Sequence, residues 1–128
     1  IIFIAAGTGI APLRSMIYEC LELFPEKKVS LIFGIRHESD FFFKDEFEHL
    51  ARDNKNFILY VCATQPSESW PYFKGRVTNI IQNIINSAQD KDVYICGPNA
   101  MINDTLSLLI KQLNFTKEQI FIERWGVP

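Results

Sequence analysis

Five apolar segments rich in β-branched residues recur along the chain and predict five strands. Within each segment the apolar residues are nearly continuous instead of alternating with polar ones, which is typical of parallel strands covered on both faces. The strands are therefore expected to lie inside a sheet with helices on its two sides. The segments are IIFIA (1–5), VSLIFGI (29–35), FILYVCA (57–63), DVYIC (92–96) and QIFIE (119–123).

The stretches between these strands have helical periodicity, with apolar residues three and four positions apart in 13–24, 43–51, 77–88 and 102–113. Alternating strands and helices predict an α/β fold: a three-layer, doubly wound, five-stranded parallel sheet of Rossmann-like type. Ligands bind such sheets at the carboxyl ends of the strands. The longest irregular segment, 64–75, follows one of these ends and is expected to be a loop beside the binding site.

Composition fits one domain and narrows the possible partners. The 128 residues are 48% hydrophobic, and 13 basic against 15 acidic residues give a net charge of −2. This charge gives no electrostatic reason to expect nucleic acid or an anionic membrane as the main partner. No apolar run approaches the roughly 20 residues that cross a bilayer, so no membrane span is expected. The three widely spaced cysteines suit a reducing compartment, and we expect a cytoplasmic location.

A glycine-containing corner, GTGIAP (7–12), follows the first predicted strand directly. Gly7 and Gly9 can adopt positive φ and admit a phosphate close to the backbone, and the start of the next helix offers unpaired N–H groups. Pro12 suits a first helical turn, and Thr8 adds a hydroxyl. Replacing Gly9 with Val should then remove nucleotide binding and leave the fold intact. Since the dinucleotide fingerprint has a third glycine where Pro12 stands, a plain strand-to-helix corner is the alternative.

A second corner, YICGPNAM (94–101), repeats this arrangement. The strand ends at Cys96, and Gly97 and Pro98 open a helix. Because parallel strands end at the same sheet edge, the two corners are expected to form one cleft, with phosphate donors from one and a thiol from the other. The alternative for Cys96 is a small buried apolar residue at the end of a strand.

Four stretches together resemble the ferredoxin-NADP reductase superfamily, specifically its C-terminal pyridine-nucleotide-binding domain. The resemblance implies that residues 1–128 are the NAD(P)-binding domain of a larger flavoprotein reductase. An N-terminal FAD-binding β-barrel would precede it, since the flavin-binding motif of the family is absent from these residues. The matching stretches are AAGTGIAPLRSM (5–16), GIRHESDFFFKDEF (34–47), YICGPNAM (94–101) and FIERW (121–125).

The resemblance also implies roles for individual residues. Cys96 would lie beside the nicotinamide ring, and Glu123 and Trp125 would face the flavin, with Trp125 replacing the commoner Phe or Tyr. The alternative for Trp125 is packing against the partner domain. No metal site is expected, because His37 and His49 lack a second ligand at metal spacing. The implied coenzyme-binding residues are Gly7, Thr8, Gly9, Ile10, Ala11, Pro12, Gly34, Arg36, Thr64, Gly97, Pro98 and Met101.

The implied reaction is hydride transfer from NAD(P)H to FAD, followed by electron transfer to an iron-sulfur, haem or small acceptor. Relatives that use NADPH place a Ser-Arg pair after the third strand, where this chain has CATQP (62–66). The missing guanidinium favours NADH, although Arg36 could reach an adenosine phosphate from the second strand. The alternative function is a non-catalytic NAD(H)-sensing or protein-interaction module on the same fold.

Three consecutive phenylalanines, Phe41 to Phe43, precede the shortest predicted helix. One of these rings could stack on adenine, but such a run more often anchors the start of a helix in the core, and we favour the core. The stretch KDEFEHLARDNK (44–55) that follows is interpreted as a solvated helix face with mixed charge, not as an acid-base centre.

Overall fold

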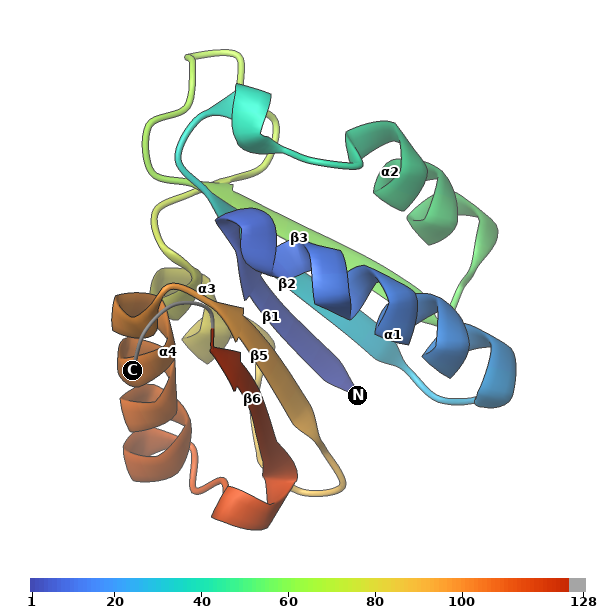
Figure 1. Ribbon diagram of the computed structural model, residues 1–128, viewed down its shortest axis with the longest axis vertical. Helices are drawn as coiled ribbons and strands as arrows, with labels where there is room; N and C mark the ends of the chain where they lie inside the picture. The colour runs from blue at the N-terminus through green and yellow to red at the C-terminus, as the bar shows by residue number, and fades with distance from the viewer. Residues whose placement is uncertain (125–128) are drawn as a thin grey trace.

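Each of the five apolar segments forms a strand in the computed structural model, which describes residues 1–124 (Figure 1). The sheet has six strands in the order β4-β3-β2-β1-β5-β6, and every neighbouring pair is parallel. The chain moves outward from β1 to β4 and then returns to β5 and β6, so the sheet is doubly wound. The strands are β1 (Ile2–Ala6), β2 (Val29–Ile35), β3 (Phe57–Ala63), β4 (Phe73–Lys74), β5 (Val93–Gly97) and β6 (Ile120–Arg124).

The sixth strand, β4, corrects the expected count of five. Its two residues lie within the segment 64–75 that was expected to be an irregular loop, and they pair with Cys62 and Ala63 at the end of β3. The Trp70 side chain is buried, and its indole N–H donates to the carbonyl oxygen of Phe73 at 2.8 Å. This anchor holds Phe73 against the sheet, and a two-residue strand is too short to leave a pattern in the sequence.

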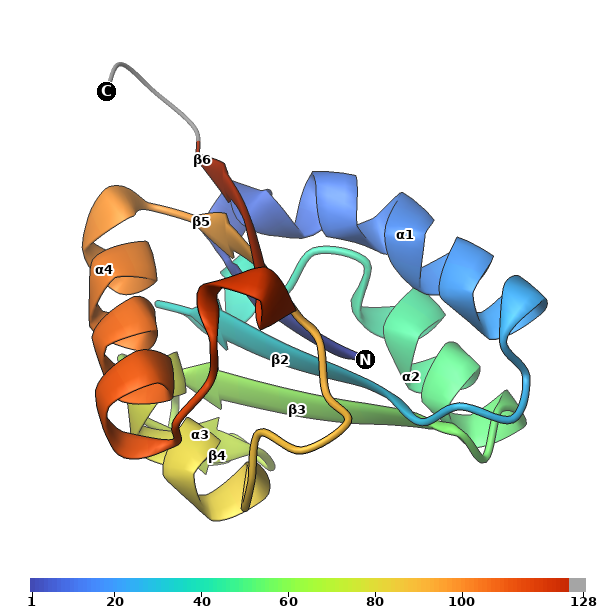
Figure 2. The same cartoon turned by 90° about the horizontal axis from the view of Figure 1, so that it is seen from below.

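Helices cover both faces of the sheet, as Figures 1 and 2 show. α1 (Ile10–Leu23) and α2 (Lys44–Asp53) lie on one face, and α3 (Val77–Ile84) and α4 (Asn99–Ser107) lie on the other. α3 ends earlier than the apolar stripe 77–88 indicates, although Ile85 is still buried. The stripe 102–113 continues from α4 into one π-helical stretch, Leu108–Gln112. Short 3-10 turns form at Gly7–Gly9, Glu38–Asp40 and Lys117–Gln119.

Two apolar cores lie on opposite sides of the sheet because successive side chains of a strand point to opposite faces. Phe3 and Ala5 of β1 pack in the core under α1 and α2, and Ile2 and Ile4 of the same strand pack in the core under α3 and α4. Most residues of a central strand therefore carry an apolar side chain. This explains why the strand segments are almost continuously hydrophobic.

The three phenylalanines before α2 divide between core and surface. Phe41 is buried, and its ring stacks on Phe33 with 5.9 Å between centroids. Phe42 and Phe43 remain about two-fifths exposed, at 41% and 42%. The core interpretation therefore holds for Phe41 alone. Phe43 has a left-handed backbone, with φ of 61°, and its ring lies 4.7 Å from the Arg14 guanidinium carbon.

Candidate functional site

The two glycine corners meet at the carboxyl ends of the adjacent strands β1 and β5. Ala5 pairs with Cys96 in the parallel register. Gly9 packs against the peptide group that joins Cys96 to Gly97. A Cβ placed on Gly9 would lie 2.3 Å from the Cys96 carbonyl oxygen and 2.9 Å from the Gly97 nitrogen. The expected convergence of the corners is confirmed. It falls where the strand order reverses, the position at which doubly wound sheets bind their ligands.

The glycines of the first corner have different structural reasons to be glycine. Gly7 has φ of 57°, a left-handed conformation, and no atom lies within 4 Å of the place its Cβ would take. Gly9 has an ordinary helical φ of −60° as the N-cap of α1, but there is no room for a Cβ. The expectation that Gly9→Val spares the fold is therefore wrong, because any side chain there meets the backbone of Cys96.

A cleft of about 550 Å³ opens at this edge of the sheet, beside the ends of β1, β2, β3 and β5. Its size lies in the range of small-molecule sites, about 300–1,000 Å³. Residues predicted from the sequence come to it from separate parts of the chain. Those that line it are Gly7, Thr8, Gly34, Arg36, Thr64, Pro98 and Met101.

The remaining predicted coenzyme residues shape the corners without lining the cleft. Ile10 is fully buried in the core, and Ala11 and Pro12 lie in the first turn of α1. Gly97 is buried at the end of β5, where its missing side chain makes room for the Met101 methyl group. These residues fix the path of the backbone around the cleft.

Cys96 and Glu123, two of the three residues expected to act at the nicotinamide and the flavin, lie side by side on β5 and β6. Cys96 is fully buried, belongs to the core on the α1 face and pairs in register with Glu123. Glu123 is exposed on β6. Neither side chain lines the cleft. Trp125 lies outside the described residues. The neighbouring Arg124 donates hydrogen bonds to the side-chain oxygens of Asn99 and Asn103, so the end of β6 is tied to α4.

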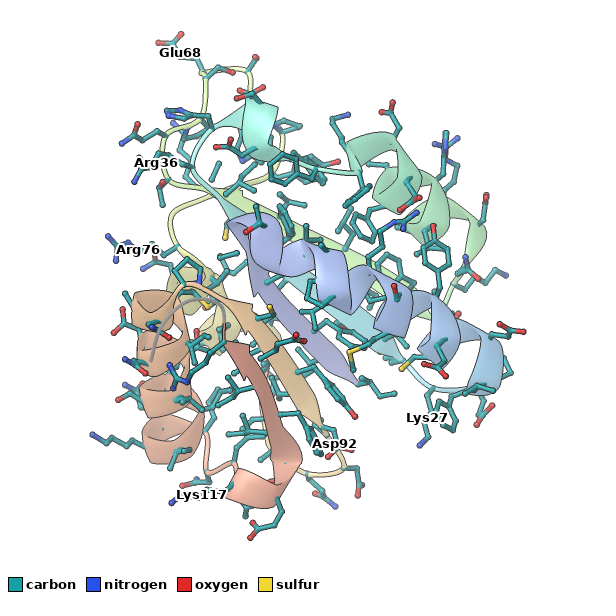
Figure 3. All side chains as sticks on the ribbon, in the orientation of Figure 1. Lys27, Arg36, Glu68, Arg76, Asp92 and Lys117 are labelled. Carbon is teal, nitrogen blue, oxygen red and sulfur yellow. The ribbon has the colours of Figure 1, made fainter. Side chains whose placement is uncertain are left out.

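Several cleft residues were missed by the sequence reasoning. Arg76, the residue before α3, lines the cleft together with Asp40 and Asp104. Phe42 also lines the cleft, although the sequence reasoning assigned it to the core and set aside stacking on adenine. Gly75 has φ of 115° and turns the chain from β4 into α3, so the Gly75–Arg76 pair just before a helical stripe was a usable signal. In Figure 3 the side chains of Arg36 and Arg76 extend from the same side of the molecule, opposite to Lys27. Within residues 1–124 neither arginine forms an ion pair.

Gly34 explains how α3 reaches the cleft. A Cβ on Gly34 would lie 2.7 Å from Cγ1 of Val77, the first residue of α3. Without that side chain the start of the helix approaches the end of β2, and Arg76 comes with it. A residue that is far from β2 in sequence therefore lines the same cleft as Arg36.

Hydrogen bonds join the segment after β2 to the loop after β3, next to the cleft residues Arg36 and Thr64. The Glu38 carboxylate accepts hydrogen bonds from the Ser67 backbone N–H at 2.9 Å and from the Ser67 hydroxyl. These bonds hold the pKa of Glu38 below its usual value. Nearby, the Gln65 N–H donates to the Arg36 carbonyl at 2.8 Å. Together these hydrogen bonds hold the loop after β3 beside the end of β2.

The structure gives the thiols differing surroundings. Burial raises the pKa of Cys62, at the end of β3, to about 12, so it is protonated at neutral pH and unreactive as a nucleophile. Burial also raises the pKa of the half-buried Cys20 on α1.

No helix within residues 1–124 is both long and apolar enough to cross a bilayer.

Comparison with known proteins agrees with this architecture. The family described as "Oxidoreductase NAD-binding domain" matches residues 3–107, which include both corners, β2 and the start of α3. The chain belongs to this family. The predicted resemblance to the NAD-binding domain of ferredoxin reductase-like proteins is thereby confirmed.

Relatives extend the comparison. One of them, from Klebsiella pneumoniae, is a component of the Na(+)-translocating NADH-quinone reductase. It is 33% identical over 132 residues, covering 98% of this chain and 32% of that protein. The human Ncb5or CS-b5R domains, solved in an NAD+ form, superpose with a TM-score of 0.86 at 27% identity, covering 94% of this chain and 35% of that one.

A more distant structure shows the same fold. It is the Neisseria gonorrhoeae ferredoxin NADP+ reductase with bound FAD and NADP, which superposes with a TM-score of 0.81 at 20% identity, over 96% of this chain and 55% of that one. The chain thus spans about a third of the curated relatives it matches and from about a third to a half of the solved structures.

Proposed function

We propose that this domain binds NAD(P)H in the cleft, with NADH preferred, and presents it for hydride transfer to an FAD held mainly by another part of a longer polypeptide. The electrons then pass to an iron-sulfur, haem or small acceptor. The observation that carries this proposal is the meeting of the Gly7–Gly9 and Gly97–Pro98 corners beside one cleft at the switch point of the sheet. The nicotinamide and flavin supply the redox chemistry, and the protein supplies binding and orientation.

The cleft offers an open backbone turn and two guanidinium groups for a diphosphate, alongside the carboxylates of Asp40 and Asp104. The left-handed turn at Gly7 leaves the backbone open where phosphate oxygens would approach, and α1 begins directly behind it. Arg36 and Arg76 supply two guanidinium groups that are free of ion pairs within residues 1–124. Guanidinium is a natural partner for a diphosphate. We therefore assign the diphosphate to the region between the first corner and these arginines.

The β5 and β6 ends are where we place the reacting part of the coenzyme. We propose that Cys96 supports the nicotinamide side of the site through the peptide that contacts Gly9, and that Glu123, its neighbour in register, faces the flavin. Trp125 is proposed to shield the flavin. All three then serve to hold reacting groups at a close and ordered distance, without a covalent step.

NADH is the preferred donor in this proposal because no arginine follows β3 directly, where Thr64 and Gln65 stand. The naming of the bacterial relatives as NADH-quinone reductase components is consistent with this choice. Arg76 reduces the expected preference for NADH over NADPH, since this arginine reaches the cleft from the start of α3. We also propose that residues 1–128 are one domain of a longer cytoplasmic flavoprotein, with an FAD-binding domain preceding them.

The experiment is a separate titration of the 128-residue chain with NADH and with NADPH, followed by calorimetry and by melting temperature. We expect both to bind, NADH more tightly, and Thr8→Ala to weaken binding because Thr8 is an exposed residue of the cleft. Ser15→Ala, exposed further along α1, is the matched control and should bind as the parent does. Saturating coenzyme without a thermal shift would overturn the proposal.

A further assay separates the enzyme from a sensing module. In the longer protein with FAD bound, NADH should bleach the flavin absorbance in a single anaerobic turnover. Coenzyme binding without flavin reduction would favour a non-catalytic NAD(H)-sensing module on the same fold.

A further inference from the structure

Thr105 is the one polar residue that is buried within residues 1–124, with no exposed surface. It lies on α4, and its hydroxyl donates a hydrogen bond to the Met101 sulfur at 3.4 Å, one helical turn earlier. A buried hydroxyl needs a partner, and a thioether is only a weak acceptor. The pair is thus a specific arrangement, and neither the family match nor the relatives assign a role to Thr105.

The other end of the Met101 side chain is also held. Its methyl carbon lies 2.5 Å from the position that a Cβ on Gly97 would take, so the absence of a side chain at Gly97 creates the space that the methyl group fills. The backbone nitrogen of Ala6 lies 3.3 Å from the same position. The Met101 methyl group therefore occupies the space beside Gly97 at the end of β5.

Met101 is one of the residues that line the cleft, next to Pro98 and Ala100 of the second corner. Methionine has three flexible side-chain bonds and normally adapts its shape to its surroundings. Here a hydrogen bond to its sulfur and a close-fitting space for its methyl group restrict these bonds. Because a wall that is ordered before binding loses little entropy when a ligand arrives, this arrangement favours tighter binding.

We propose that Thr105 is a positioning residue for the coenzyme: its hydroxyl holds the Met101 sulfur, so that the methionine forms a preordered apolar wall of the cleft. This inference rests on the proposed function, and the ligand class is the reduced nicotinamide dinucleotide. Thr105 does not line the cleft and acts only through Met101.

The test compares variants of the 128-residue chain by NADH titration and by thermal melting. Thr105→Val keeps the shape and removes the hydroxyl, and Thr105→Ser keeps the hydroxyl and removes the methyl group. We expect Thr105→Val to raise the Kd for NADH about three- to fivefold, as expected for residues coupled through one contact. Thr105→Ser should bind NADH within about twofold of the parent, even though its smaller side chain costs some thermal stability.

A double-mutant cycle adds a readout that a purely structural role would not change. Met101→Leu removes the sulfur acceptor, so in its presence Thr105→Val should have no further effect on the Kd for NADH. Equal Kd values for the parent and Thr105→Val, full additivity with Met101→Leu, or weakening by Thr105→Ser equal to that by Thr105→Val would each overturn the inference while leaving the proposed function intact. Failure of the parent chain to bind NADH would overturn both.

Discussion

Gly9 lies so close to the backbone of Cys96 that a Cβ on Gly9 would be 2.3 Å from the Cys96 carbonyl oxygen. The contact joins the start of α1 to the end of β5 and holds the two corners in one arrangement. It also means that a residue expected to act only on nucleotide binding is first of all a packing residue. At this corner Gly9 is needed for packing, whereas Gly7 has open space around it and is the glycine at which a ligand can approach the backbone.

We predict that Gly9→Ala lowers the stability of the domain more than Gly7→Ala. The Gly9 Cβ would overlap backbone atoms that cannot move without shifting β5, and overpacking of this kind costs about 1–3 kcal/mol or more. At Gly7 the space is open, and a left-handed alanine costs about 1–2 kcal/mol. Urea unfolding measures both variants. A smaller loss for Gly9→Ala than for Gly7→Ala would contradict the contact.

A second prediction concerns Cys96, which has no exposed surface. In the flavin-containing protein we expect Cys96→Ala to slow hydride transfer more than it weakens NADH binding, because loss of the buried sulfur loosens the packing that positions the Cys96 peptide, where the nicotinamide is proposed to bind. Cys62→Ala is the matched control: this thiol is also fully buried at a strand end, but on β3. Stopped-flow flavin reduction and equilibrium titration give the two quantities. Equal losses in both would make Cys96 a structural thiol.

The third prediction concerns the choice between the two coenzymes. Arg36 and Arg76 both line the cleft and are free of ion pairs within residues 1–124. We expect Arg76→Ala to weaken binding of NADPH more than of NADH, since the extra phosphate of NADPH gains most from a nearby guanidinium. Calorimetric titration at two salt concentrations measures the ratio. Lys117→Ala is the control, since Lys117 lies far from both Arg36 and Arg76 in Figure 3, and it should leave the ratio unchanged.

A fourth prediction uses the link between α1 and α2. The Arg14 guanidinium donates to both carboxylate oxygens of Glu46, at 2.5 and 2.6 Å, and this holds the pKa of Glu46 below its usual value of 4.5. A lowered pKa in the folded state means that the folded protein binds fewer protons. The contribution of Glu46 to stability is therefore complete above about pH 4.5 and is lost as the pH falls further.

Glu46→Gln checks this pH dependence. The variant should unfold more easily than the parent at neutral pH, and the difference should shrink as the pH is lowered below 4.5. Because both side chains are partly exposed, we expect an effect of at most about 1 kcal/mol. Denaturant unfolding at a series of pH values measures it. A difference that stays constant down to about pH 3 would rule out the proposed linkage.

The sequence predicted the alternation of strands and helices well because that information is local. A central strand such as β1 is apolar on both sides, and a helix such as α1 repeats its apolar residues every three or four positions. β4 was missed for the opposite reason. Its two residues are extended only because Trp70 anchors the loop and Phe73 pairs with Cys62, and such contacts leave no periodic signal.

Some of the residues that line the cleft could be predicted from local sequence, and others could not. Residues in glycine-containing corners, such as Thr8 and Pro98, were predicted because the corner itself is a local pattern. Arg76 and Phe42 were not, because each reaches the cleft only through packing elsewhere: Val77 against Gly34 for the arginine, and Phe41 against Phe33 for the phenylalanine. Each of these two residues is placed by the packing of the buried residue next to it in the chain, Val77 or Phe41.

The amino-acid sequence by itself determined the layered α/β architecture and the two glycine corners, since local periodicity, glycine conformation and the order of strands along the chain are sufficient for both. Only the tertiary structure decided that Gly9 is a packing residue, that Arg76 stands at the cleft, and that Thr105 holds Met101. Each of these depends on distances between elements that are separate in the chain or on which side of a helix is buried, and such distances arise only when the sheet and its helices pack together.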